Sequence, residues 1–200
     1  LAALQDTGKP LVLLDMRLPG YCCVNPDHQL GAYLATRHLV ALGRRRIAML
    51  CGSLAHHSIH ERSRGFRKAL FEARMLADPE LEVQLPSVGE ALANVRQAVD
   101  ALLALPKPPD ALFCYNDSTA LAAMQHCLER GLKVPHDLAI VGFDDIQAAA
   151  AAIPPLSSIA IDKEALGAMG IALLLEKTPA LDADRTLPVQ LVVRESSNDD

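Results

Sequence analysis

Residues 109–145 read PDALFCYNDSTALAAMQHCLERGLKVPHDLAIVGFDD, and this stretch decides the fold. Two short runs, Asp110–Cys114 and Leu138–Phe143, have the apolar character and the bounding proline or glycine of buried strands. Between them, apolar side chains recur at helical spacing and stop at Gly131. A strand, a helix and a second strand in this order predict a βαβ unit with two parallel strands.

The same alternation continues on both sides of this unit. Further strands are expected at 11–14, 47–50, 81–83, 159–161 and 187–193, and further helices at 30–42, 61–74, 92–102 and 166–173. The alanine run 148–152 fits either a short helix or a packed loop. Because βαβ units cross over right-handed, we expect an α/β fold in which parallel sheets are flanked by helices on both faces.

The composition excludes some classes of protein. Half of the 200 residues are hydrophobic and the formal net charge is −5, which argues against gripping nucleic acid or an anionic membrane by bulk charge. The longest apolar runs, such as Ile171–Leu175, are too short to span a bilayer, and Leu1–Thr7 lacks the pattern of a signal peptide. The five cysteines show no Cys-x-x-Cys spacing. We expect them to be small buried residues in a reducing compartment, and therefore a cytoplasmic protein without membrane contact.

Polar side chains follow four of the predicted strands, at the edge where ligands of parallel sheets bind. They are Asp15, then Ser58 and Arg62, then Asn116 and Asp117, and finally Asp144 and Asp145. An arginine, an amide and carboxylates around one cleft suit a ligand with several hydroxyl groups.

Each of these residues also has a structural explanation. Asn116 fits a helix N-cap, and Asp117 fits a charge in the first helical turn. Asp15 and Asp144 fit turn residues, and Arg62 fits a solvated helix arginine. Individually the signals are weak, and it is their joint position at four strand ends that favours a ligand site.

Several kinds of chemistry find no support in the sequence. His56, His57 and His60 are expected in an exposed loop before the Arg62 helix rather than at a metal, because no acidic or cysteine ligand has fitting spacing. No glycine-rich phosphate loop and no Gly-x-Ser-x-Gly nucleophile motif occurs. We therefore expect no catalytic residues, no metal and no cofactor, that is, a binding protein rather than an enzyme.

Seven blocks of the sequence, in order, resemble the effector-binding domain of the LacI/GalR family of bacterial transcription regulators. They are Val24–Ala48, Arg62–Leu70, Pro109–Asp117, Gly131–Leu138, Val141–Asp145, Pro154–Ile159 and Leu187–Ser196. The resemblance implies a two-lobed periplasmic-binding-protein-like fold with an incomplete N-terminal lobe. Residues 1–20 and 157–176 would be the remnant of that lobe, and residues 24–155 and 178–196 would form the C-terminal lobe.

The resemblance also implies roles for the strand-end residues. Arg62, Asn116 and Asp144 would hold the polar groups of a small-molecule effector, with Asp15 and Ser58 as weaker contacts. Many members place aromatic side chains against a sugar where this chain has Lys163 and the stretch 87–90. This difference favours a sugar acid or a phosphorylated sugar over a plain pyranose.

The expected partners follow from the same resemblance. The helix-turn-helix of the family is absent from this sequence, so operator DNA would be read only through that missing N-terminal part, in a homodimer. The runner-up interpretation is a periplasmic solute-binding protein for a sugar transporter, and a third is a doubly wound enzyme of small metabolites. The block Gly43–Ile47 and the ending Leu187–Ser196 favour the regulator.

Overall fold

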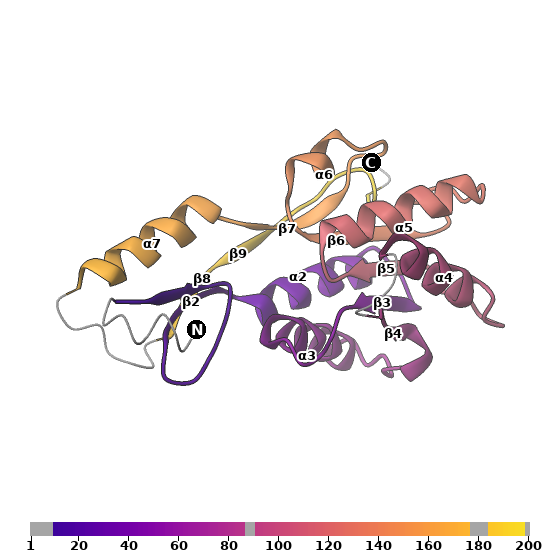
Figure 1. Cartoon of the computed structure of the whole chain (residues 1–200). Helices are drawn as coiled ribbons and strands as arrows, with labels where there is room; N and C mark the ends of the chain where they lie inside the picture. The colour runs from indigo at the N-terminus through magenta and orange to yellow at the C-terminus, as the bar shows by residue number, and fades with distance from the viewer. Residues whose placement is uncertain (1–9, 87–90, 177–183, 199–200) are drawn as a thin grey trace.

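The computed structural model describes residues 10–86, 91–176 and 184–198. Two sheets divide them between a larger and a smaller unit, which lie end to end in an elongated molecule (Figure 1). Among these residues no helix combines the length and the apolar character needed to cross a membrane. All five cysteines are buried and unbridged, as expected.

The larger unit is built on a six-stranded sheet of order β4-β3-β5-β6-β7-β9. Its strands are β3 (Ile47–Cys51), β4 (Glu82–Gln84), β5 (Ala111–Cys114), β6 (Ala139–Asp144), β7 (Ser157–Ile161) and β9 (Val189–Val192). All neighbours are parallel except β7 and β9. The central strands are buried on both faces, which is why they appear in the sequence as continuous apolar runs rather than alternating ones.

Helices cover both faces of this sheet, as predicted. On one face lie α2 (His28–Ala41) and α3 (His57–Glu72), and on the other lie α4 (Ala91–Leu103) and α5 (Asp117–Glu129). The short η1 (Pro79–Leu81) precedes β4. The alanine run forms α6 (Gln147–Ala151), the helical one of the two alternatives.

The contact between α2 and α3 requires a glycine at position 65. A Cβ atom added there would lie 2.1 Å from the backbone oxygen of Gln29 on α2. The two helix backbones therefore approach so closely that no side chain fits between them. This packing fixes the α3 side chains relative to the first turn of α2.

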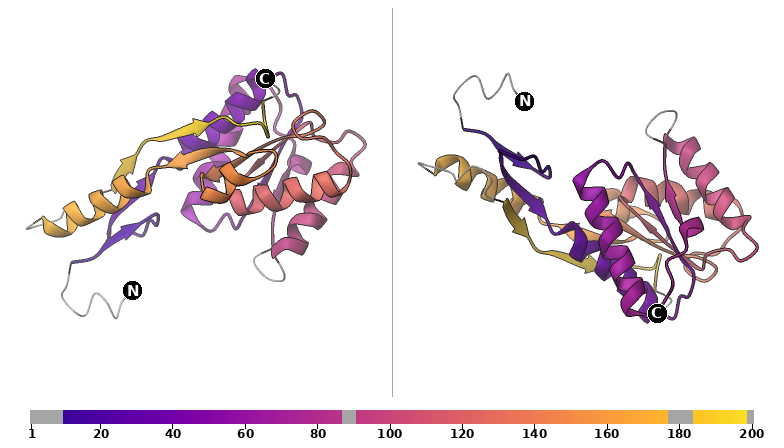
Figure 2. Two further views of the ribbon diagram at one scale, coloured as in Figure 1. Left: turned by 90° about the horizontal axis from the view of Figure 1, so that it is seen from above. Right: turned by 90° about the horizontal axis from the view of Figure 1, so that it is seen from below.

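The smaller unit is a three-stranded parallel sheet of order β1-β2-β8. Its strands are β1 (Val12–Leu14), β2 (Cys22–Pro26) and β8 (Asp184–Leu187), and α7 (Lys163–Leu175) packs against it. The chain passes between the two units at three places, from β2 to α2, from β7 to α7 and from β8 to β9 (Figures 1 and 2).

The structure differs from the sequence-based expectations at three elements. The strand β2 was not predicted. The histidines His57 and His60 were expected in an exposed loop, and this is wrong, because α3 already begins at His57. The single terminal strand 187–193 is two strands in different sheets, because Pro188 has no backbone N–H to continue a ladder.

The sheets also distribute the chain differently from the expected lobe ranges. The range 157–176 is divided, since β7 pairs within the large sheet whereas α7 packs on the small one. The range 24–155 begins inside β2, which belongs to the small sheet, and the described part of 178–196 is divided between β8 and β9. The pairing changes sheet between Leu187 and Val189, about ten residues after the expected boundary at 178, whereas the expected starts at 24 and 157 lie within a few residues of such a change.

Candidate functional site

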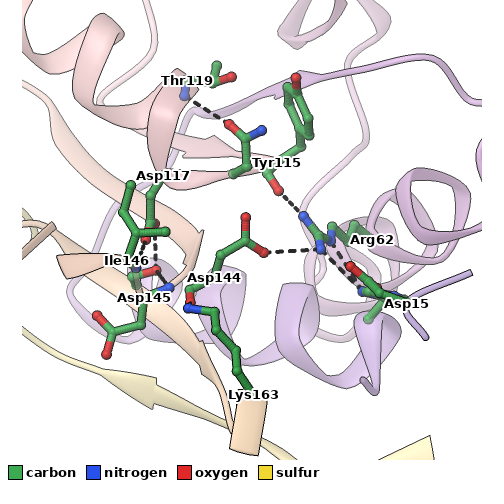
Figure 3. Close-up of polar contacts among 12 residues, drawn as sticks. Asp15, Arg62, Tyr115, Asp117, Thr119, Asp144, Asp145, Ile146 and Lys163 are labelled. Atoms are coloured by element: carbon green, nitrogen blue, oxygen red, sulfur yellow. Dashed lines mark hydrogen bonds and ion pairs between the residues drawn. The ribbon is translucent and has the colours of Figure 1, made fainter. Parts of the chain in front are cut away.

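Three of the five predicted site residues, Asp15, Arg62 and Asp144, lie together where strands of both sheets end (Figure 3). Asp15 directly follows β1 of the small sheet, and Asp144 is the last residue of β6 in the large sheet. Arg62 projects from the second turn of α3, which follows β3. The parallel arrangement brings these chain-distant residues to one rim.

Arg62 is the centre of this cluster and is almost fully buried, with 4% of its surface exposed. Its guanidinium donates to the backbone oxygen of Tyr115 and lies 3.4 Å from Oδ1 of Asp144. It also lies over the ring of Phe143, with the guanidinium carbon 3.7 Å from the ring centroid. The sequence-based alternative of a solvated helix arginine is therefore excluded.

A histidine connects Arg62 to the small sheet. His28 is 3% exposed and stands at the first position of α2. Its Nδ1 accepts a hydrogen bond from Arg62 over 3.4 Å, and its Nε2 lies 3.0 Å from Oδ1 of Asp15. Residues from β6, α3, α2 and the end of β1 thus form one chain of polar contacts across both units.

Asp144 presents its carboxylate to the rim in a half-buried position. Burial raises the pKa of this carboxyl group, whereas Arg62 opposes the shift by favouring the charged form. The ammonium group of Lys163, at the start of α7, donates to the backbone oxygen of Asp144 over 2.7 Å. The next residue, Asp145, instead pairs with Arg194 at 2.8 Å, so the two neighbouring carboxylates diverge.

The remaining two predicted residues have other surroundings. The side-chain oxygen of Asn116 accepts from the backbone amide of Thr119 over 2.8 Å, so Asn116 is the N-cap of α5. Ser58 lines a neighbouring hollow of about 310 Å³ together with Gly52, Ser53, His56, Ile59, Leu85, Pro86 and Tyr115. The structure therefore joins Arg62 directly to Asp144 and, through His28, to Asp15, whereas Ser58 lines the hollow that Tyr115 also borders.

The arrangement can hold a polar molecule by paired hydrogen bonds. Carboxylate oxygens of Asp15 and Asp144 accept from hydroxyl groups, and Lys163 offers a cation at the edge of the site. Across the described residues there is no group of three or more His, Cys, Asp or Glu side chains that could hold a metal ion. The stretch 87–90, which was discussed as a possible ligand contact, lies outside the described residues.

Comparison with known proteins identifies the family. Residues 36–197 match the family described as periplasmic binding protein-like domain. The HTH-type transcriptional repressor PurR of Haemophilus influenzae is 37% identical over 169 residues, which cover 84% of this chain and 49% of the repressor.

The chain is a periplasmic binding protein-like domain of the LacI type. Solved structures agree with this. A LacI family transcriptional regulator from Enterococcus faecium with bound ribose superposes with a TM-score of 0.83 at 28% identity, covering 97% of this chain and 72% of that one. The complex of the transcriptional regulator CelR with cellobiose gives a TM-score of 0.84 at 30% identity, covering 97% and 61%. This LacI-type domain spans about half the length of the curated relatives that it matches.

Sequence analysis missed one residue of the site of this LacI-type domain and did not anticipate the burial of another. His28 was not considered, because the strand before it, β2, was not predicted and its exit was not examined. Asp117 was interpreted as a charge in a first helical turn; it does stand in the first turn of α5, but it is fully buried and hydrogen-bonded to other elements. No pattern in the sequence distinguishes a buried aspartate of this kind from an exposed one at a helix start.

Proposed function

We propose that this chain is the effector-sensing part of a LacI-type transcriptional regulator and binds a small sugar-like or sugar-acid molecule at the Asp15–Arg62–Asp144 rim. One observation carries the proposal. The buried Arg62 guanidinium contacts the carboxylate of Asp144 from the large sheet and, through His28, is connected to the carboxylate of Asp15 after the small sheet's β1, at the edge where parallel sheets bind ligands. A molecule bound to both carboxylates would bridge the two units and favour one arrangement of them.

The ligand chemistry is inferred from the same residues. Asp15 and Asp144 accept hydrogen bonds from hydroxyl groups, and Ser58 and Asn116 would add weaker contacts from the neighbouring hollow and from the start of α5. Lys163 supplies a positive charge where a carboxylate or phosphate of the ligand would lie. Relatives with cellobiose and with ribose support a sugar-like molecule, and Lys163 favours an acidic one.

The proposed regulatory output is control of operator DNA. Curated relatives about twice as long are HTH-type repressors, which supports operator binding through a helix-turn-helix in the whole protein, as a cytoplasmic homodimer. Effector and operator binding would then be coupled reciprocally. Because the relatives are regulators, we favour this role over a transporter's solute-binding protein and over an enzyme, and we assign no catalytic residue.

A ligand screen followed by calorimetry tests the proposal. Full-length protein is screened by thermal shift with ribose, cellobiose, gluconate and ribose 5-phosphate, since a ligand that binds the native state raises the unfolding temperature. For the ligand found, Asp144→Asn and Lys163→Met should each weaken binding by about 1.5–3 kcal/mol, which is roughly 10- to 150-fold. Lys107→Met, an exposed lysine between α4 and β5, is the matched control and should leave affinity unchanged. Equal affinity of Asp144→Asn and the control would remove this rim from the binding site.

A further inference from the structure

Asp117, in the first turn of α5, is a fully buried carboxylate that the effector site does not use directly. Its Oδ1 accepts a hydrogen bond of 2.6 Å from the hydroxyl of Ser158 on β7, and its Oδ2 accepts one of 2.8 Å from the backbone amide of Ile146. Ser158 Oγ in turn accepts from the backbone amide of Asp145 over 3.1 Å. Both amides belong to the loop that follows β6, so the carboxylate connects α5 and β7 to this loop (Figure 3).

That loop has an unfavourable backbone conformation. Asp144 has a φ of 103° and Asp145 a φ of 44°, a region that residues with a side chain rarely adopt. Two such residues in succession persist only where the surroundings hold them. The amide of Asp145 itself is bonded to Ser158, the partner of Asp117, and the amide of the next residue, Ile146, is bonded to Asp117.

We propose that Asp117 is a positioning residue for the effector site, which holds the Asp144–Ile146 loop in the conformation that directs the Asp144 carboxylate toward Arg62 and the ligand. This role rests on the proposed function only in so far as Asp144 contacts the ligand. The hydrogen bonds account for how a buried charge is tolerated. Burial raises the pKa of Asp117 to about 6, the neighbouring carboxylates Asp144 and Asp145 raise it as well, and the two hydrogen bonds oppose this shift.

Gly142 provides a second, independent indication that the place of the carboxylate matters. A Cβ atom added at this position in β6 would lie 2.1 Å from Asp117 Oδ1 and 3.1 Å from Leu156 Cδ2. The carboxylate of Asp117 therefore occupies the space that a side chain at position 142 of β6 would need. Gly142→Ala would displace the carboxylate without removing it, whereas Asp117→Ala would remove it and leave room for the added methyl group.

Hydrogen exchange of the full-length protein without ligand tests this role. In Asp117→Ala the amides of Asp145 and Ile146 should exchange about tenfold faster or more, because each loses a hydrogen bond or its support. Gly142→Ala should have the same local effect, and adding it to Asp117→Ala should change little, since residues that act on one interaction are not additive. Asp117→Asn keeps an oxygen acceptor, so in this variant the amides of Asp145 and Ile146 should exchange at nearly the wild-type rate. Ser118→Ala, at the exposed next residue, is the matched control.

A binding measurement with ribose as the probe completes the test. Affinity should fall about tenfold or more in Asp117→Ala relative to Ser118→Ala, and Asp117→Asn should restore most of it. The role is overturned if loop exchange in Asp117→Ala equals that of the control, or if exchange rises equally in β3 and β5, which would show a general loss of stability. A wild type that binds neither ribose nor any of the other three screened molecules would count against the proposed ligand class, and the exchange result would still decide the role of Asp117.

Discussion

Removing the buried guanidinium at residue 62 should destabilise the protein far more than removing an exposed one on the same helix. Arg62→Ala leaves the Tyr115 carbonyl without its donor and the half-buried Asp144 carboxylate without its nearest cation. Breaking a buried pair from one side typically costs about 3–5 kcal/mol. Because Asp144 is partly exposed and can recruit water, we expect about 2–4 kcal/mol here.

The expected loss depends on pH in a defined direction. Burial raises the pKa of Asp144, and Arg62 opposes this shift. In Arg62→Ala that opposition is lost, so the pKa of Asp144 should be higher than in the wild type. A carboxyl group whose folded pKa is raised above its unfolded value makes the native state bind a proton more tightly, so stability increases as pH falls toward the unfolded pKa near 4. The difference in unfolding free energy between wild type and Arg62→Ala should therefore become smaller at pH 5 than at pH 7.5.

Denaturant unfolding of both proteins at the two pH values measures this effect. Arg64→Ala is the control, because Arg64 stands two residues further along the same helix, is more than half exposed and pairs with Glu61 at 3.0 Å. Such a surface pair contributes less than about 1 kcal/mol. Equal unfolding free energies for Arg62→Ala and Arg64→Ala at pH 7.5 would refute the reasoning that Arg62 is a buried, paired cation.

Three further outcomes follow from single contacts. Gly65→Ala should lower the unfolding free energy by about 1–3 kcal/mol, because the methyl group meets the Gln29 carbonyl, and denaturant unfolding checks this. Asn116→Ala should lower the unfolding free energy by about 1 kcal/mol even without ligand, because the N-cap of α5 is lost. Asn116→Ser, which can still cap the helix, should leave it nearly unchanged. An effect of Asn116→Ala on ligand affinity alone would contradict the cap. Burial raises the folded pKa of Asp117 to about 6, above the ordinary aspartate pKa of about 3.9, so the native state binds a proton more tightly than the unfolded state. From pH 7.5 to pH 4 the unfolding free energy of the wild type should therefore rise by up to about 3 kcal/mol relative to that of Asp117→Asn. Unfolding at both pH values measures this, and a constant difference would contradict a raised pKa.

Much of the large unit could be predicted because its signals are local. The strands β3, β5 and β6 are apolar on both faces, and the helices between them carry apolar side chains at helical spacing. The rim could be predicted as well, since strand ends of a parallel sheet meet at one edge and Arg62 and Asp144 follow two such ends.

The rest depends on contacts that a single sequence does not display. The segment Cys22–Pro26 contains Asn25 and ends in proline, both unfavourable in strands, and forms β2 only because β1 and β8 pair with it. Missing this strand also meant missing His28 directly after it. Asn116 was equally compatible with a cap and a ligand contact, and its bond to Thr119 shows the cap, whereas a ligand role for it stays a prediction.

The most direct test of the central claim is a crystal structure of the full-length protein with the ligand found in the screen. The account predicts ligand oxygens within about 3.2 Å of Asp144 and of Asp15 or Lys163, with Arg62 still on the ring of Phe143. A ligand held elsewhere, with the carboxylates of Asp15 and Asp144 both free of contact, would contradict it.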